Sequence, residues 1–336
     1  MPPSPQACRV PWAGLAWAIA FSFAAPGALG ADLYVDNVAG SDELNGARRS
    51  TARGAGPVRT INRALCLARP GDRIVIAKTS EPYREQLTIG GRRLRGNSLR
   101  PLTITSDGAV LDGTVRAATG AWRHLRGDVF AMRPRRLAYQ QLLLDGAPLQ
   151  RVGLISLDGA AAALRPREWA LVGGNLLMRT DAARLPSDYD LRHAGLQTGV
   201  TLYNARDVVI EGLVIQGFQL DGVNAHGLVK NCVLRGLECR ANGRSGISAG
   251  GVSRLRAAAC NVYDNGAVQV RTEALARLDL DGCDVERDAG TPAWSDGSGG
   301  LRIDGEPAGD EDVTRSRGAK RLSAAASLPR SQAAGR

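Results

Sequence analysis

The chain has few aromatic side chains, which make up 4% of its 336 residues, and few lysines, which stand only at Lys78, Lys230 and Lys320. It also lacks a phosphate-binding loop, a Gly-x-Ser-x-Gly nucleophile elbow and a dinucleotide fingerprint on a βαβ unit. The scarcity of aromatics argues against the stacking platforms of single-strand nucleic-acid binders. All other basic residues are arginine, a bias that we attribute to base composition and from which we infer no arginine-specific function.

Long apolar runs are also scarce, and the one near the start of the chain predicts export. Val10 to Ala25 is apolar but shorter than the roughly 20 residues that cross a bilayer, and small residues follow it up to Gly30. This pattern is typical of a cleaved signal peptide and predicts a secreted, periplasmic or cell-surface protein without a membrane span. An uncleaved anchor is the alternative. Cys8 precedes the run, and the odd number of cysteines after it argues against a full disulfide framework.

Glycine and positive charge, by contrast, are abundant. The chain has 41 glycines without a collagen-like period, well above the usual share of about 7%. This content favours a turn-dense β architecture over a helical bundle. The net charge of +10 favours acidic partners such as uronic-acid or sulfated glycans, or anionic surfaces.

Residues 208–303 repeat with a period of 23 to 24 residues. Each repeat holds short β-type segments separated by turns, so stacked repeats must bury their apolar rows against one another. The rows are Val208, Cys232, Leu255 and Leu278; Ile210, Leu234, Ala257 and Leu280; Leu213, Leu237, Cys260 and Cys283; Ile215, Cys239, Val262 and Val285; and Val223, Ile247 and Val270. Coils of this length, stacked at about 4.8 Å, predict a right-handed parallel β-helix.

The N-terminal part resembles a known fold family. The motifs that carry the resemblance are Tyr34-Val35-Asp36, Gly40-Ser41-Asp42, Asn45-Gly46, Pro57-Val58-Arg59-Thr60-Ile61, Ala64-Leu65, Pro70-Gly71-Asp72 and Tyr83-Arg84-Glu85. Together they resemble the N-terminal signature of the pectate-lyase-like superfamily of secreted β-helix proteins. The resemblance implies that a helix near Ile61 to Ala68 covers the open end of the coil stack. It also implies that a small β insertion, with a turn at Leu144-Asp145-Gly146, interrupts the coils.

The predicted architecture is therefore all-β, with an N-terminal capping helix and a small antiparallel β insertion. We expect a signal peptide over residues 1–30 and the cap with the first coils over 31–113. The β-rich insertion is expected over 114–199, the coils of about 23 residues over 200–306, and a disordered basic tail over 307–336.

A polar strip on the outer face of the coils is the predicted site. Because Val223 and Ala225 face inward, the alternation of a strand turns their neighbours outward, and the matching positions of later coils lie beside them. The predicted catalytic residues are Asp221, His226, Lys230, Arg271 and Glu273, and the predicted substrate-binding residues are Asn224, Arg244 and Ser248. An ordinary solvated face is the alternative interpretation.

Two chemistries are compatible with these residues. In a polysaccharide lyase, an arginine would neutralise the uronate carboxylate, and Lys230 or His226 would accept the proton. In a glycoside hydrolase, Asp221 and Glu273, two coils apart, would form the carboxylate pair. The interpretation is thus an exported β-helix protein that engages an extracellular acidic polysaccharide, as a lyase or a hydrolase. The alternative is a non-catalytic glycan-binding or cell-surface structural module. Nucleic acid is not an expected partner.

Other polar residues have mainly structural interpretations. Cys260 and Cys283 share an inward row, which predicts reduced thiols stacked in the core, because in-register side chains seldom adopt the dihedral of a disulfide. Asn242 and Asn265, one period apart, predict an internal amide ladder. The cysteine spacings do not predict a zinc site. The loop with Asp36, Asp42, Glu43 and Asn45 offers oxygen ligands for calcium, and no other cofactor is expected.

Overall fold

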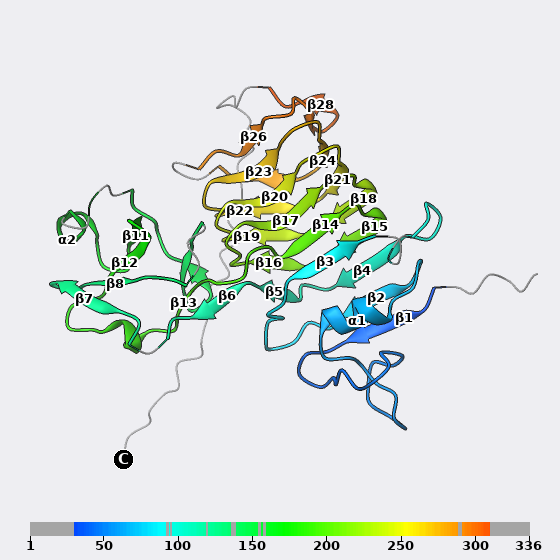
Figure 1. The fold of residues 1–336 in the computed structure, drawn as a ribbon, viewed down its shortest axis with the longest axis horizontal. Coiled ribbons are helices and arrows are strands. Elements are labelled where there is room, and N and C mark those ends of the chain that lie inside the picture. Colours follow the sequence, from blue (N-terminus) through cyan, green and yellow to red (C-terminus); the bar gives the residue numbers. More distant parts are fainter. Residues whose placement is uncertain are drawn as a thin grey trace, which may run out of the picture.

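The computed structural model describes residues 30–91, 94, 96–118, 120–135, 139–153, 156, 159–287 and 291–309. The predicted signal segment before residue 30 and the predicted tail after residue 309 lie outside the described residues. Within them, the chain forms a stack of coils whose strands line up in three parallel sheets (Figure 1). No helix in this part of the chain combines the length and the hydrophobicity needed to span a membrane.

The three sheets of the coils are named sheets 1, 2 and 3. Sheet 1 contains β1 (Asp32–Val35), β2 (Arg73–Ile76), β4 (Leu102–Ser106), β15 (Arg206–Glu211), β18 (Lys230–Arg235), β21 (Arg254–Ala258), β24 (Arg277–Asp281) and β27 (Leu301–Ile303), followed by the antiparallel β28 (Glu306–Pro307). Sheet 2 contains β5 (Val110–Asp112), β16 (Val214–Gln216), β19 (Glu238–Arg240), β22 (Asn261–Tyr263) and β25 (Asp284–Val285). Sheet 3 contains β3 (Leu87–Gly90), β14 (Val200–Tyr203), β17 (Asp221–His226), β20 (Ser245–Ala249), β23 (Val268–Thr272) and β26 (Trp294–Asp296).

The strand registers confirm the predicted parallel β-helix. Val208 pairs with Cys232, Cys232 with Leu255, and Leu255 with Leu278, so this predicted row crosses four coils in register. The rows in sheets 2 and 3 follow the same rule. The inward side chains form one continuous hydrophobic core that extends from Leu33 to Leu301. Stacking thus buries apolar rows that a single coil would expose.

The predicted capping helix is present as α1 (Ile61–Leu67). Its N-cap is Thr60, whose side chain accepts a hydrogen bond from the Arg63 N–H. Ile61, Ala64 and Leu65 are buried, and the helix contacts β1, β2 and β3 at the N-terminal end of the stack. The helix therefore covers apolar side chains of the first coil.

The antiparallel insertion lies beside the coils (Figure 1). One of its sheets contains β6 (Thr114–Arg116), β9 (Leu142–Leu144), β10 (Ala147–Pro148) and β13 (Leu191–Ala194). The other contains β7 (Arg123–Arg126), β8 (Val129–Met132), β11 (Trp169–Val172) and β12 (Asn175–Arg179). The insertion also holds the short helices α2 (Ala160–Ala163) and η1 (Pro186–Asp188). It has hydrophobic clusters of its own, one of them around the fully buried Trp169.

Candidate functional site

Seven of the eight predicted site residues lie in or beside sheet 3, and six of them form one group. Asp221 and Asn224 lie in β17, Ser248 in β20 and Arg271 in β23. Asn224, Ser248 and Arg271 are register partners, as the predicted outward ladder requires. Arg244 directly precedes β20, and Glu273 directly follows β23.

The centre of this group is the Asp221 carboxylate, whose side chain is completely buried. It accepts hydrogen bonds from Arg244 Nε at 2.9 Å, Ser245 Oγ at 2.7 Å and Asn224 Nδ2 at 2.9 Å. The hydrogen bond to Asp221 raises the pKa of Arg244 above its ordinary value. Both carboxylate oxygens are therefore engaged, and Asp221 fixes the orientation of Arg244 and Asn224.

The group also contains a second ion pair, between Arg271 in β23 and Glu273 directly after this strand. Arg271 Nε is buried and has no hydrogen-bond partner among the described residues. Ser248, in the same ladder, is only 2% exposed, although alternation predicts an outward side chain. The polar contacts are thus satisfied around Asp221, whereas Arg271 keeps one buried N–H donor without a partner among the described residues.

The other two predicted residues lie outside this group, His226 in the same sheet and Lys230 in sheet 1. His226, at the end of β17, packs its ring against Tyr203 in the neighbouring coil, with centroids 4.8 Å apart. Lys230 is the first residue of β18, in sheet 1, and it is exposed. The structure therefore does not bring Lys230 together with Asp221 and Glu273 on one sheet.

Sheet 1 carries a groove on its outer face. Its volume is about 560 Å³, and its wall residues come from four coils and from the loop before β4. The lining residues are Asn97, Ser98, Pro101, Asp207, Val209, Asn231, Cys232, Val233, Arg254, Leu255, Arg256 and Asp279. The half-buried Val209 and Val233 pair in register, so they form an apolar floor between polar margins.

A row of positive side chains, here called the cation row, stands at the starts of the strands of sheet 1, and one of its members, Arg254, also lines the groove. Four successive strands of sheet 1 each begin with one of its members, Arg206, Lys230, Arg254 and Arg277, and all four residues are exposed. Backbone hydrogen bonds join these strand starts from coil to coil. Arg206 pairs with Asp207 at 3.2 Å, whereas the other three have no carboxylate partner among the described residues.

An exposed apolar row runs beside the cation row. It consists of Leu228, Val252 and Leu275, each two residues before a cation and 57%, 48% and 75% exposed, respectively. The residue between each apolar side chain and its cation is buried and anchors the corner in the core. Exposed apolar side chains in contiguous positions indicate a contact surface.

The pattern that marks this surface is visible in the sequence but was not recognised there. Leu228-Val229-Lys230, Val252-Ser253-Arg254 and Leu275-Ala276-Arg277 recur at the coil period. Base composition accounts for the number of arginines, but the place of Lys230, Arg254 and Arg277 at the starts of successive strands distinguishes these three cations from the others. Lys230 is the one predicted site residue that belongs to this row.

The acidic loop predicted as a calcium site uses its oxygens internally. Asp36 accepts the Val38 and Ala39 N–H groups, and Asp42 accepts those of Arg59 and Thr60. In the part of the chain that the structure describes, no three His, Cys, Asp or Glu side chains cluster as a metal site would require. The carboxylates of Asp36 and Asp42 thus hold the loop and the residues before α1 in place.

Comparisons with known proteins find similarity at the level of solved structures. No protein-family model matches the chain, and no curated protein matches it significantly. A complex of XylC with xylose is 11% identical, with a TM-score of 0.39, over 81% of this chain and 69% of that chain. A glycoside hydrolase is 9% identical, with a TM-score of 0.43, over 75% of this chain and 78% of that chain. The pectate lyase Pel9A is 11% identical, with a TM-score of 0.37, over 82% of this chain and 59% of that chain.

These similarities do not define an activity for this chain. The register of the sheets and the position of α1 are independent of any comparison. They show a parallel β-helix with a helix at its N-terminal end, which is the fold that the N-terminal motifs imply.

Proposed function

We propose that this protein binds an acidic polysaccharide along the groove of sheet 1, with the acid groups of the sugars on the cation row. The observation that carries the proposal is the run of exposed cations Lys230, Arg254 and Arg277, one in each of three successive coils and none paired with a described carboxylate. A repeating anion is the ligand class that complements a repeating cation.

The geometry suits an extended chain that lies along the stack. Neighbouring strands of a sheet are about 4.8 Å apart, so the coils offer positive charges at a regular, short interval. The apolar row of Leu228, Val252 and Leu275 would contact the C–H faces of sugar rings, while the floor of Val209 and Val233 keeps the centre of the groove apolar. The ligand would thus receive charge on one side and apolar contact on the other.

Electrostatics favours occupancy of the row by an anion. Like charges stacked in adjacent coils repel one another, and this repulsion is relieved when an acid group lies between them. Because the cations are exposed, salt screens the attraction, and the affinity should fall as ionic strength rises.

A second candidate function is cleavage of the bound chain by β-elimination. The observation that favours it is the position of Lys230 between Arg206 and Arg254 in the cation row. An amine that accepts a proton would then lie beside guanidinium groups that neutralise the uronate carboxylate. Hydrolysis through Asp221 is less well supported, because that carboxylate is buried and fully hydrogen bonded.

The binding proposal is tested with a polyuronate and a neutral glycan of similar length, measured by calorimetry at low and high salt. The double variant Lys230→Glu and Arg254→Glu should weaken polyuronate binding by at least about tenfold, since each reversal costs on the order of 1 kcal/mol. The matched control is Arg123→Glu, an exposed arginine in β7 of the insertion.

Retained affinity in the double variant, or equal affinity for the neutral glycan, would overturn the proposal. Elimination is followed in the same samples by the ultraviolet absorbance of the unsaturated product. Absorbance that rises with the wild type and not with Lys230→Gln supports the lyase function, and a flat trace with retained binding supports binding alone.

A further inference from the structure

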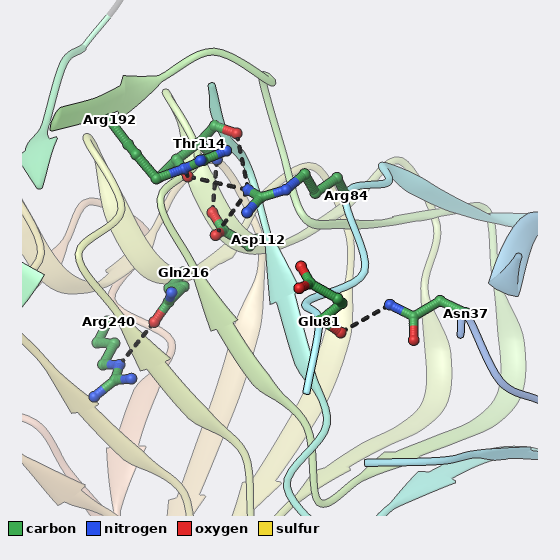
Figure 2. Close-up of polar contacts among 8 residues, drawn as sticks. All are labelled: Asn37, Glu81, Arg84, Asp112, Thr114, Arg192, Gln216 and Arg240. Atoms are coloured by element: carbon green, nitrogen blue, oxygen red, sulfur yellow. Dashed lines mark hydrogen bonds and ion pairs between the residues drawn. The ribbon is translucent and has the colours of Figure 1, made fainter. Parts of the chain in front are cut away.

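The joint between the insertion and the first coil carries charges that the groove of sheet 1 does not use. Figure 2 shows the side chains of Arg84, Asp112, Thr114 and Arg192 pointing toward one another. Asp112 ends β5, Thr114 begins β6, and Arg192 lies in β13. The group therefore forms where the chain leaves the coils for the insertion and where it returns.

This group lies at the end of an outward column of sheet 2. The segment before β3 bridges to β5, which places Arg84 next to Asp112. Asp112 pairs in register with Gln216, and Gln216 pairs with Arg240. Arg240 Nε donates to Gln216 Oε1 at 3.0 Å, as Figure 2 shows. A third guanidinium thus lies two coils above Asp112.

The positive charges of the group exceed the negative ones. Arg84 Nη1 donates to Asp112 Oδ2 at 3.0 Å and lies 3.4 Å from Thr114 Oγ1. Arg192 Nε donates to the same Thr114 Oγ1 at 2.9 Å. Asp112 is the single carboxylate in this contact, and its other oxygen accepts the Thr114 N–H at 2.7 Å. Arg192 forms no ion pair with a described carboxylate.

The surroundings make the uncompensated charge costly. The Asp112 side chain is only 6% exposed, while that of Arg84 is 38% exposed, so the group opens to solvent on one side. Burial, and after it the positive charge of Arg84, lowers the pKa of Arg192 below its ordinary value. An anion therefore stabilises a partly buried guanidinium group more than it stabilises one in open solvent.

We propose that the guanidinium groups of Arg84 and Arg192 form a binding site for one oxyanion at the joint of the insertion. Planar guanidinium groups bind carboxylate, sulfate and phosphate through paired N–H donors, which is the chemistry that the two arginines offer here. The source is either an acid group on a sugar or a free inorganic anion. The site lies between the end of β5 in sheet 2 and β13 of the insertion, and it does not depend on polysaccharide binding at sheet 1.

The test is calorimetric titration of the full chain with sodium sulfate, sodium phosphate and sodium galacturonate, with ionic strength held constant by chloride. Arg192→Gln should weaken binding by at least about tenfold, because it removes charge-assisted hydrogen bonds. Asp112→Asn should strengthen binding by about tenfold, since it removes the carboxylate that competes for Arg84. If Arg192 only held the insertion against the coils, Asp112→Asn would not bind anions more tightly than the wild type.

Arg167→Gln is the matched control, because Arg167 lies in the insertion but pairs with Asp181 at 2.9 Å. Arg192→Lys keeps the positive charge but loses the paired N–H donors of the guanidinium group, so it should bind with intermediate affinity. Circular dichroism checks that each variant is folded. Galacturonate that binds more tightly than sulfate identifies a sugar acid as the source, and the reverse order identifies an inorganic anion. The proposal is overturned if the wild type shows no saturable binding of any of the three anions. Equal affinities of the wild type and Arg192→Gln would also overturn it.

Discussion

Asn242 joins three successive coils through one buried amide. Its Oδ1 accepts the Phe218 N–H at 3.2 Å, and its Nδ2 donates to the Ile215 carbonyl at 3.2 Å and to Asn265 Oδ1 at 3.0 Å. Asn265 repeats the pattern one coil later and donates to the Cys239 carbonyl at 3.0 Å. The Phe218 N–H lies at the turn between sheets 2 and 3, while the Ile215 and Cys239 carbonyls belong to β16 and β19, and buried backbone groups such as these need a hydrogen-bond partner.

Replacement of Asn242 by alanine should therefore be strongly destabilising. The Phe218 N–H and the Ile215 carbonyl would lose their partners inside the core, which should lower the free energy of unfolding by about 3 kcal/mol. Urea denaturation followed by circular dichroism measures this change. Asn261→Ala, an exposed asparagine in β22, is the control and should change stability by less than about 0.5 kcal/mol. Similar losses in the two variants would contradict the role of the amide ladder.

Two neighbouring thiols differ in acidity because of their contact. All five described cysteines are free, and the Cys260 N–H donates to Cys283 Sγ at 3.4 Å. A side-chain hydrogen bond between the two thiols lowers the pKa of the half-buried Cys283 and raises the pKa of Cys260. The stacked row thus holds one thiol that ionises more readily than an ordinary cysteine.

Alkylation of Cys283 should consequently show a pH midpoint below the ordinary thiol value of about 8.5. Because the thiolate is the reactive form, Cys260→Ala should move the midpoint upward, toward that value. The measurement is the rate of iodoacetamide labelling of the Cys283 peptide by mass spectrometry over a pH series. Cys232→Ala leaves the contact intact and should keep the wild-type midpoint. A midpoint that does not move in Cys260→Ala would refute the assigned cause.

At the scale of elements, α1 is held at its N-terminus by a residue from another part of the first coil. The Glu85 carboxylate accepts the Ile61 N–H at 2.9 Å and the Asn62 N–H at 3.0 Å. Both donors lie in the first turn, where no carbonyl of the helix can reach them, and a negative charge there is favoured by the helix dipole. Glu85 therefore ties the helix to the segment that leads into β3.

Glu85→Ala should lower the free energy of unfolding by about 1 to 2 kcal/mol, in the range of a lost helix cap. Urea denaturation followed by circular dichroism provides the value. Glu81→Ala is the matched control, since only the backbone carbonyl of Glu81 is hydrogen bonded to Asn37 (Figure 2). If the two variants proved equally stable, Glu85 would have no capping role.

The elements also show which sequence patterns were informative. The apolar rows predict the inward face of each strand because burial requires the same alternation in every coil. Ser248 shows the limit of that rule, because its outward position is shielded between Asn224 and Arg271 in the same column. Longer side chains on the neighbouring strands can cover a short outward side chain. The alternation along one strand gives only the direction of a side chain and not what covers it.

At the scale of the whole molecule, the coils and the insertion have separate hydrophobic cores. One cluster runs through the coils, while two smaller clusters lie within the insertion. Trp169 is fully buried in one of the latter, and its Nε1 donates to the Leu149 carbonyl at 2.9 Å. Cores that share few contacts can open separately.

Trp169→Ala should therefore accelerate amide hydrogen exchange across the insertion strands while the coil strands from β15 to β24 keep their protection. The expected local loss is about 3 to 5 kcal/mol, as for a large aromatic side chain. Exchange detected by mass spectrometry compares the two regions. Ile247→Ala, at a fully buried position of β20, should produce the opposite pattern. Equal acceleration in both regions would show that the coils and the insertion unfold as one unit.

The sequence alone determined the architecture of this protein, because a repeated coil must place like residues in register, and its apolar rows are local and periodic. The same period located the amide ladder, and the N-terminal motifs implied the capping helix. The tertiary structure decided which sheet each polar residue faces. Lys230 and Asp221 are nine positions apart in the sequence, yet the corner between β17 and β18 puts them on different sheets. Arg84 and Arg192 are far apart in the chain, and only the return of the insertion to the first coil joins them at Thr114.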